Sequence, residues 1–329
     1  MSINLESNFC RKQFLQKLKD SYANEEAFLK TKLNYHFQKS GKLLRPQMTF
    51  DLLVALGVSD TNAEQWALIT ELIHNASLIH DDLQDEDEYR RGQKSYWAQF
   101  GMVSAINAGD FLIMKSSHAI GDLEVADDVK WKLNQILMNC SMELVRGQEL
   151  ELELEHTADI DLWDRYLDCI SKKTSSLFLM AVQAAAYLSE VKLDLASLEE
   201  VFAQYGKCFQ LYDDLIDLIG DKGREKSAND LREGKWSSLV IRYILENGSK
   251  KEELRQFLKK NRKDVCDESV NFWVKEFLES GVIDFSKNEI RQSLEQLKLS
   301  IKKSPKKIEE NFEMVISRSF SEDLLEANL

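Results

Sequence analysis

The sequence predicts an all-α protein, and three observations carry this prediction. The chain has 329 residues but only two prolines and 13 glycines, whereas average usage would give roughly 16 prolines and 23 glycines. Apolar residues recur at helical spacing along most of the chain,. No segment rich in Pro, Gly or Ser divides it. Turn-rich β architectures need such residues, so we expect long helices in a single domain of residues 1–329.

The helical pattern can be followed in order along the chain. Its early runs are Phe14, Leu15 and Leu18, then Leu52, Leu53 and Leu56, then Leu68, Ile69, Leu72 and Ile73. Breaks are expected near residues 40–41, 57–60, 91–92, 121–122, 156–159, 220–234 and 247–248,. Asp60 and Asp159 have the residue type and position of helix N-caps,.

The longest apolar run covers residues 177–188 and includes Gln183. A membrane-spanning helix needs about 20 apolar residues, so this run predicts a fully buried helix and no transmembrane segment. The chain is more charged from about residue 250 onward, which predicts a peripheral helical layer there.

Charge and cysteine content bound the function. The net charge of −13 disfavours nucleic acid as a partner, because phosphate backbones are bound by basic surfaces. The five cysteines are odd in number and form no Cys-x-x-Cys motif, as expected for reduced thiols in a cytoplasmic protein. The first ten residues have neither the basic nor the apolar region of a secretory signal,.

The most informative feature is a repeated acidic motif. Asp-Asp-x-x-Asp occurs at residues 81–85 and again at 213–217, each within apolar, helix-forming sequence. Residues i and i+4 of a helix share a face about 6 Å apart along the axis. Carboxylate oxygens suit Mg²⁺, which also takes water and phosphate oxygens. One copy alone is more often an exposed acidic surface, but surface acidity does not predict the same triad twice. The repeat predicts two carboxylate clusters that hold a metal-bound polyphosphate.

Basic residues lie at predicted helix boundaries close to both motifs. Any one of them is typical of a solvated surface charge, but together they supply the cations that a diphosphate needs. They are Lys42 and Arg45 before Pro46, Arg90 and Arg91 after the first motif, Lys173, and Lys226 and Lys235 after the second. His74 lies two helical turns before Asp81, where a packing role and a diphosphate contact both remain open.

Ordered motifs extend over roughly residues 35–240. They include Gly-Lys-Leu-Leu-Arg-Pro at 41–46, His-Asn-Ala-Ser-Leu-Ile-His-Asp-Asp-Leu-Gln-Asp at 74–85, Arg-Arg-Gly at 90–92, Ala-Gly-Asp at 108–110, Gly-Gln at 147–148, Lys-Thr at 173–174, Phe-Gln at 209–210, the second acidic motif, and Asp-Leu-Arg-Glu-Gly-Lys at 230–235. In this order and spacing the chain resembles the trans-isoprenyl diphosphate synthase family, which includes farnesyl, geranylgeranyl and longer polyprenyl diphosphate synthases.

The resemblance implies a fold, a metal and a set of roles. The fold is an isoprenoid synthase-type helical bundle around a central cavity, usually in a homodimer, with three Mg²⁺ ions. The metal ligands would be Asp81, Asp82, Asp85, Asp213 and Asp217. The allylic diphosphate would be bound by Arg90, Lys173, Lys226 and Lys235, and isopentenyl diphosphate by Lys42, Arg45, His74 and Arg91. Thr174 and Gln210 would line the reacting region.

Three segments depart from the family pattern. Glu225 replaces the usual glycine before Lys226, and Trp236-Ser-Ser follows Lys235 where Thr-Leu-Pro is usual. Gln93-Lys-Ser follows Arg-Arg-Gly in place of x-Pro-Thr. None of these departures removes a cation.

Product length depends on where the growing chain meets the cavity floor. Family members that stop at farnesyl commonly have aromatic bulk just before the first aspartate. Here Ala76 and Ser77 are small, so the resemblance favours a geranylgeranyl (C20) product, with farnesyl or longer products as alternatives. Phe111, Met114 or Val145 could also form the floor.

Two other functions stay open. A terpene cyclase of the same fold would not need an isopentenyl diphosphate site, so Lys42, Arg45 and Arg91 argue against it. A catalytically silent partner subunit usually lacks one acidic motif, and both are intact here.

Overall fold

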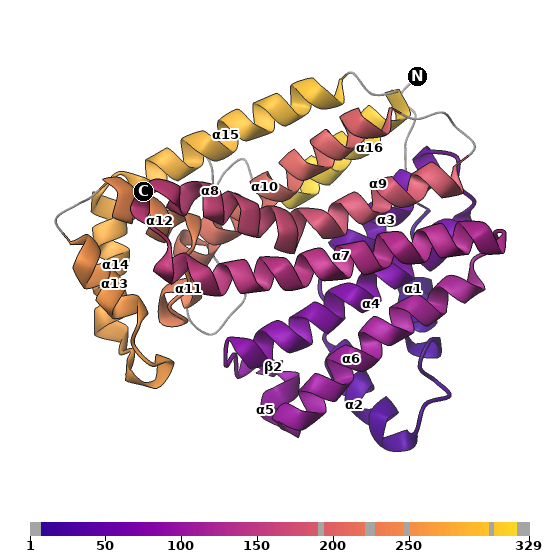
Figure 1. The fold of residues 1–329 in the computed structure, drawn as a ribbon, viewed down its shortest axis with the longest axis horizontal. Helices are drawn as coiled ribbons and strands as arrows, with labels where there is room; N and C mark the ends of the chain where they lie inside the picture. Colours follow the sequence, from indigo (N-terminus) through magenta and orange to yellow (C-terminus); the bar gives the residue numbers. More distant parts are fainter. Residues whose placement is uncertain (1–7, 190–193, 221–227, 247–249, 303–305, 321–329) are drawn as a thin grey trace. The chain divides into compact units, whose positions relative to one another are not determined.

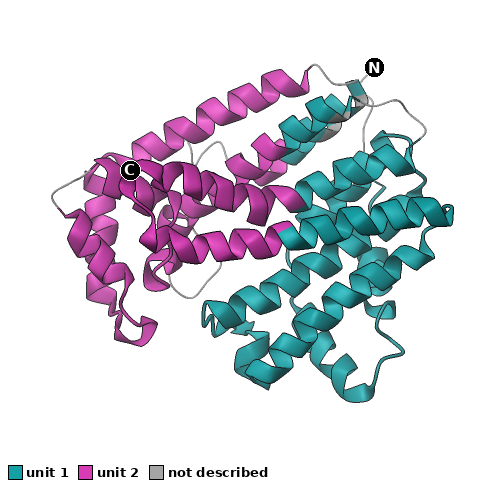
Figure 2. Cartoon of the chain, in the orientation of Figure 1, with its two compact units in different colours: residues 1–142, 177–202, 304–315 teal, residues 143–176, 203–303, 316–329 magenta. Residues whose placement is uncertain are grey.

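The computed structural model describes residues 8–189, 194–220, 228–246, 250–302 and 306–320, and these residues are mainly helical (Figure 1). The all-α prediction is confirmed. The described chain divides into two compact units (Figure 2). Unit 1 comprises Met1–Met142, Leu177–Phe202 and Ser304–Val315, and unit 2 comprises Glu143–Ser176, Ala203–Lys303 and Ile316–Leu329. A single domain over residues 1–329 stays a prediction.

Unit 1 is built around one long helix, α4. Its elements are α1 (Arg11–Asp20), α2 (Ala27–Gln38), α3 (Leu44–Ala55), α4 (Asp60–Gln84), β1 (Tyr89–Arg90), β2 (Gln93–Lys94), α5 (Tyr96–Phe100), α6 (Met102–His118), the 3₁₀ turn η1 (Ala119–Asp122), most of α9 (Ser176–Leu188), and parts of α7 (Asp127–Glu153), α10 (Leu195–Ile219) and α16 (Lys306–Ser319). Helix α4 packs between α3 and α6, with Trp66, Ile69 and Leu72 fully buried. Burying these side chains is the main stabilising term for such a helix.

Unit 2 contains the remaining helices. They are the latter parts of α7 and α10, the 3₁₀ turn η2 (Leu154–His156), α8 (Asp159–Ile170), the π-helical turn η3 (Ser171–Ser175), α11 (Asn229–Arg232), α12 (Ser238–Glu246), α13 (Lys251–Leu258), the 3₁₀ turn η4 (Arg262–Asp264), α14 (Asp267–Glu279), α15 (Val282–Ile301) and the end of α16. The Arg242 guanidinium lies 3.6 Å from the Trp163 ring centre and 4.3 Å from that of Phe285. These cation–π contacts stabilise the packing of α12 against α8 and α15.

Three sequence predictions need correction. Ser59, not Asp60, is the N-cap of α4, because the Ser59 hydroxyl accepts the Asn62 backbone N–H. Asp159 is the first residue of α8 after Ala158, and its carboxylate accepts hydrogen bonds from Lys251 and Arg255. Helix α9 is not fully buried, because Tyr187 in its last turn is 46% exposed. No helix in the described part of the chain is long and apolar enough to cross a membrane.

The π-helical turn η3 packs directly against α10 in unit 2. A Cβ added at Gly206 would lie 2.2 Å from the Ser175 hydroxyl and 2.7 Å from the Ser175 Cα. The second of these is backbone and cannot rotate away, so only glycine allows this approach. A π-helical turn is rare and is often found at functional sites, and η3 carries Lys173 and Thr174.

We therefore predict that Gly206→Ala destabilises the protein, although alanine has the higher helix propensity by about 1 kcal/mol. Overpacking costs about 1–3 kcal/mol, so the free energy of unfolding should fall by roughly 1–2 kcal/mol in urea titrations. Gly121→Ala is the matched control, since a Cβ there meets no atom within 4 Å. Equal stability of the two variants would contradict the close packing of η3 on α10.

Candidate active site

The first acidic motif lies at the C-terminal end of α4. Asp81 and Asp82 are in its last turn, and Asp85 is its C-cap residue. A helix C-terminus carries partial negative charge and favours cations, so the carboxylates and the helix end act in the same direction. Asp82 is 1% exposed, whereas Asp81 and Asp85 are half-buried. This place on the helix suits cation binding.

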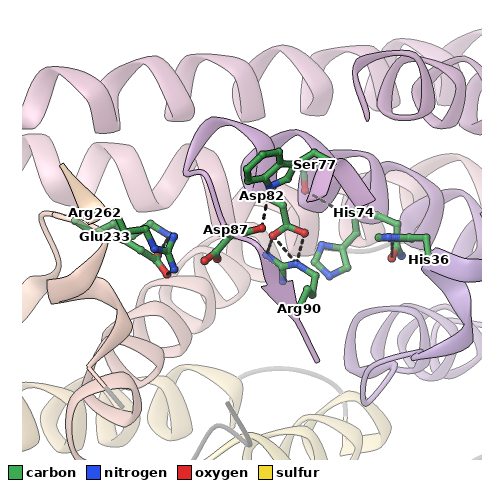
Figure 3. A network of polar contacts seen from close by, with 11 residues as sticks. His36, His74, Ser77, Asp82, Asp87, Arg90, Glu233 and Arg262 are labelled. Carbon is green, nitrogen blue, oxygen red and sulfur yellow. Dashed lines mark hydrogen bonds and ion pairs between the residues drawn. The ribbon is translucent and has the colours of Figure 1, made fainter. Parts of the chain in front are cut away.

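Asp82 forms a buried ion pair with Arg90 (Figure 3). The Arg90 Nε donates to both Asp82 carboxylate oxygens at 2.7 Å, and its Nη2 lies 2.5 Å from Oδ1. Burial raises the pKa of Asp82 to about 6, although Arg90 acts against this. Burial by itself lowers the pKa of Arg90, but the negative charge of Asp82 and its hydrogen bonds have the larger effect, so the pKa of the guanidinium is raised. Asp82 therefore holds Arg90 in a fixed orientation.

A two-residue hairpin places Arg90 and Arg91. Strands β1 and β2 pair Tyr89 with Lys94 and Arg90 with Gln93. The turn residues have positive φ, +54° at Arg91 and +71° at Gly92, as a type I′ turn requires. The hairpin was not predicted from the helical pattern. A non-glycine residue with positive φ costs of order 1–2 kcal/mol, so Arg91 is held there by contacts elsewhere.

Arg91 reaches back to the loop before α3. Its Nη1 donates to the Lys39 carbonyl at 3.0 Å, and a Cβ added at Gly41 would lie 2.7 Å from Arg91 Nη2. Glycine at position 41 therefore leaves room for the guanidinium. The neighbouring Lys42 side chain is exposed. Two residues of the predicted isopentenyl diphosphate site, Lys42 and Arg91, thus belong to one loop–hairpin assembly in unit 1, and Arg45 follows in the first turn of α3.

Arg45 and His74 are brought together. The Arg45 Nη1 lies 3.4 Å from His74 Nε2, and the guanidinium lies 5.2 Å from the Phe178 ring centre. Burial and the positive charge of Arg45 hold the pKa of His74 well below its usual range, so the ring is neutral and Nε2 accepts from Arg45. Nδ1 then carries the proton, and it is buried without a hydrogen-bond partner among the described residues.

A buried polar network behind these cations was not predicted. The Asn75 amide donates to the Glu71 carboxylate and carbonyl, both at 2.8 Å, and its oxygen lies 3.0 Å from His36 Nε2. Burial lowers the pKa of His36 to about 4, so Nε2–H is the donor of a neutral ring. Burial raises the pKa of Glu71, while Arg91, Arg45 and Arg11 act against this. Glu71 is therefore a buried acidic side chain that feels the positive charge of all three arginines.

The second acidic motif occupies the last turns of α10 in unit 2. Asp213 is half-buried, and the Asp217 carboxylate accepts the Asp230 backbone N–H at 2.8 Å. The middle residue has a different role. Asp214 is buried and accepts from the Tyr166 hydroxyl at 2.6 Å, the Gln210 amide at 2.8 Å and the Ser238 backbone N–H at 2.7 Å. Burial raises the pKa of Asp214, and these donors act against it.

The Asp214 network fixes two residues predicted for the reacting region. Gln210 donates to Asp214 with its amide nitrogen and accepts from the Thr174 hydroxyl with its oxygen, at 2.8 Å. The chain Thr174–Gln210–Asp214–Tyr166 therefore has assigned donors and acceptors throughout. Sequence reasoning did not predict Tyr166, whose partner is 48 residues away.

The two predicted cations of unit 2 that the structure describes, Lys173 and Lys235, are each matched with an acid. Lys173 donates to Glu151. Burial raises the pKa of the Glu151 carboxyl, but the positive charges of Lys173 and Lys235 have the larger combined effect and lower it. Lys235 lies 2.8 Å from Glu233, which also binds Arg262 at 3.1 Å (Figure 3). Trp236 is buried, and the Arg255 guanidinium lies over its ring, 4.9 Å from the centre of the Trp236 ring. Lys226 and Glu225 lie outside the described residues.

The donor set suits hard divalent cations, since both acidic motifs supply carboxylate oxygens at helix C-terminal ends,. Among the described residues, no group of three or more Asp, Glu, His or Cys side chains is gathered closely enough to hold a metal ion. Asp82 is turned toward Arg90 instead. The chemistry of the donors therefore fits the metal, and in this structure Asp82 is paired with Arg90.

Comparison with known proteins decides the family. The model of the polyprenyl synthetase family matches residues 26–276. The chain belongs to the polyprenyl synthetase family. Its members are trans-isoprenyl diphosphate synthases, so the protein is a prenyltransferase, and the family resemblance predicted from the motifs is confirmed.

Individual members of the polyprenyl synthetase family support this assignment. The chain is 32% identical over 265 residues to a short chain isoprenyl diphosphate synthase of Methanocaldococcus jannaschii, covering 77% of this chain and 79% of that one. The structure of a Pyrococcus horikoshii geranylgeranyl pyrophosphate synthetase has a TM-score of 0.79 at 26% identity and covers 96% of each chain. The fold alone is also shared with a Caulobacter crescentus polyprenyl synthase, solved with calcium and isoprenyl diphosphate, which has a TM-score of 0.81 at 23% identity and covers 94% of each chain.

We predict that Tyr166→Phe destabilises the protein, because Asp214 stays buried with one donor fewer. An unsatisfied buried acceptor costs about 1–3 kcal/mol, which should appear as a lower free energy of unfolding in urea. Tyr187→Phe is the matched control, since Tyr187 is 46% exposed. Two variants of equal stability would show that Asp214 does not depend on the Tyr166 hydroxyl.

A second prediction concerns the stability of the folded protein at acidic pH. The unfolded chain binds a proton at His36 below the usual pKa of 6.5, whereas the folded protein does so only below about 4. Stability is therefore lost as pH falls through this window. His36→Gln keeps an N–H donor for Asn75 without a titrating ring. From pH 7 to pH 5 the wild type should lose about 2 kcal/mol more than this variant. Parallel losses in urea titrations at the two pH values would contradict a buried neutral His36.

Proposed function

We propose that the protein condenses isopentenyl diphosphate head-to-tail (1′-4) with an allylic diphosphate to give a trans-polyprenyl diphosphate. The observation that carries this proposal is the arrangement in unit 1. Arg45 on α3 and Arg91 on the hairpin supply positive charge beside the neutral His74 of α4, and the acidic motif lies two to three turns further along α4. A cationic site beside a separate carboxylate site suits two diphosphates held in different ways, one by side chains and one through metal.

The proposed roles follow the chemistry of each group. Asp81, Asp82, Asp85, Asp213 and Asp217 are the proposed ligands of three Mg²⁺ ions, which when bound neutralise the charge that develops on the departing diphosphate. Arg90, Lys173, Lys226 and Lys235 are proposed to bind that allylic diphosphate. Their acidic partners, Asp82, Glu151 and Glu233, hold the described cations in place before substrate binds. Such preorganised charge is the main source of electrostatic catalysis.

Condensation breaks the allylic C1′–O bond and forms a bond from C1′ to C4 of isopentenyl diphosphate. The proton lost from isopentenyl C2 is proposed to pass to the released diphosphate. The Thr174 hydroxyl donates to the Gln210 amide oxygen, and the Gln210 amide nitrogen donates to Asp214. Because these groups are hydrogen-bonded to one another, the network is suited to orienting a substrate and less suited to accepting a proton. Neutral His74 and the exposed Lys42 are proposed donors to isopentenyl diphosphate. The proposed reaction requires that water be kept from the allylic cation, which it would otherwise trap.

The experiment that tests this function uses purified protein with Mg²⁺, isopentenyl diphosphate and, separately, the C5, C10 and C15 allylic diphosphates. Chromatographic sizing of the products should show condensation, with chelator abolishing it. No condensation with any allylic partner would overturn the proposal and favour a silent partner subunit. A cyclic hydrocarbon from a prenyl diphosphate alone would indicate a terpene cyclase.

Product length, cell compartment and assembly are part of the same proposal. A C20 product is supported by the small side chains at positions 76 and 77, and Phe111 is the remaining candidate for the floor, since Met114 and Val145 are 70% and 63% exposed. A cytoplasmic location is supported by five free cysteines. A homodimer is supported by apolar side chains exposed on α6, namely Val103, Ile106 and Met114, which a second copy could cover.

We predict that Ala76→Phe shortens the product. Ala76 is fully buried one turn before the acidic motif, so a ring there would fill the space expected for the growing chain. Because overpacking can destabilise by about 1–3 kcal/mol, Ser77→Phe at a half-buried position serves as a second variant. Ala126→Phe, at an exposed position, is the control. Unchanged chain length in both test variants would place the floor elsewhere.

A further inference from the structure

The loop before α3 has little stabilisation of its own. Leu43 is the N-cap residue of α3, has a φ of +55° and offers no side-chain cap to the helix. A leucine in the left-handed region is strained, and a helix N-terminus without a cap has unsatisfied N–H groups. This loop nevertheless positions Lys42 and, one turn later, Arg45. Contacts from outside the loop must therefore hold it.

Arg11 supplies these contacts from the first helix. Its Nη2 donates to the Gly41 carbonyl at 2.9 Å and to the Ser40 hydroxyl at 3.1 Å, and its Nη1 lies 3.3 Å from the Lys42 carbonyl. Arg91 donates to the Lys39 carbonyl of the same loop. Four consecutive residues are thus held by two guanidinium groups from distant parts of unit 1. A rigid guanidinium fork is suited to bridging several acceptors, which a lysine ammonium cannot do in the same geometry.

Helix α1 is itself anchored, so Arg11 is placed with precision. Phe14 and Leu18 are buried, and Lys17 forms an ion pair with Glu64 of α4 at 3.0 Å. Phe9 packs on Phe14 and Phe50, with ring centres 5.1 and 5.8 Å apart. The segment lies outside every motif that identified the family, yet it bonds to the loop that carries Lys42 and leads into the turn of α3 that carries Arg45.

We propose that Arg11 is a positioning residue for isopentenyl diphosphate, because it holds the loop of residues 40–42 in the conformation that presents Lys42 and Arg45. Both of its terminal nitrogens are engaged with the loop, so Arg11 acts through the loop and not as a ligand. Without it, the loop must be ordered when the substrate binds, and this cost weakens binding. The inference rests on the proposed function, which assigns Lys42 and Arg45 to this substrate.

The test compares Arg11→Ala and Arg11→Lys with Lys12→Ala, an exposed lysine on the same helix that controls for the loss of one charge. A hydrogen bond from a charged donor is worth roughly a tenfold factor, and because Arg11 is exposed its three contacts together are expected to contribute about one such factor,. Arg11→Ala should therefore raise the KM for isopentenyl diphosphate about tenfold. The KM for the allylic diphosphate and kcat at saturation should stay within about twofold. Arg11→Lys should restore little of the loss, and Lys12→Ala should behave as wild type.

Two further measurements do not need turnover. Inorganic pyrophosphate, titrated calorimetrically in the presence of chelator, should bind Arg11→Ala more weakly by the same factor. Amide hydrogen exchange should accelerate at Gly41, Lys42 and Leu43 while α4 keeps its protection. An unchanged KM for isopentenyl diphosphate, or equal rises for both substrates, would overturn the inference. Absence of condensation by the wild type would instead refute the proposed function, and the pyrophosphate and exchange results would then decide whether Arg11 orders the loop.

Discussion

The site in unit 1 depends on the ion pair between Asp82 and Arg90. Asp82 is almost completely buried, and an ionised carboxylate in such a place is tolerated only with a charged partner. Arg90 supplies it through three short contacts and is thereby fixed at the end of the acidic motif. Arg90 also sets the register of the hairpin, and the next residue, Arg91, reaches back to the loop before α3. One buried pair therefore links the acidic motif to the cationic site.

Several arginines of unit 1 lie close enough to repel one another, and nearby buried acidic side chains reduce this electrostatic cost. Arg11, Arg45 and Arg91 all act on Glu71, which Asn75 holds in place within α4. The same arrangement recurs in unit 2, where Glu151 and Glu233 match Lys173 and Lys235. Removing one partner from such a pair is more damaging than the pair is stabilising, since a charge is left buried and alone. Cations held in this way need no reorganisation when an anionic substrate arrives.

The sequence was sufficient to predict the helices and the family, because apolar periodicity and motif order are local properties. The family resemblance also implied one site for Arg45 and His74 and another for Thr174 and Gln210, and the structure brings these pairs within 3.4 and 2.8 Å. The hairpin at Arg91 was missed because helical patterning does not register a two-residue turn, although Arg-Gly with a positive φ at both positions is its cause. The N-cap of α4 was assigned one residue late, since Ser59 and Asp60 are both good capping residues,.

The supporting residues could not be predicted, because their partners are distant in sequence. Arg11 contacts a loop about 30 residues away, and Tyr166 contacts Asp214 48 residues away. Glu71 and Asn75 did give a signal, as polar residues within the apolar face of a helix, but nothing in the sequence identified His36 as their partner. A double-mutant cycle of Asp82→Asn and Arg90→Gln, measured by urea unfolding without divalent metal, tests the central pair most directly. A coupling energy of about 1.5 kcal/mol or more is predicted, whereas additive losses of stability would contradict the account.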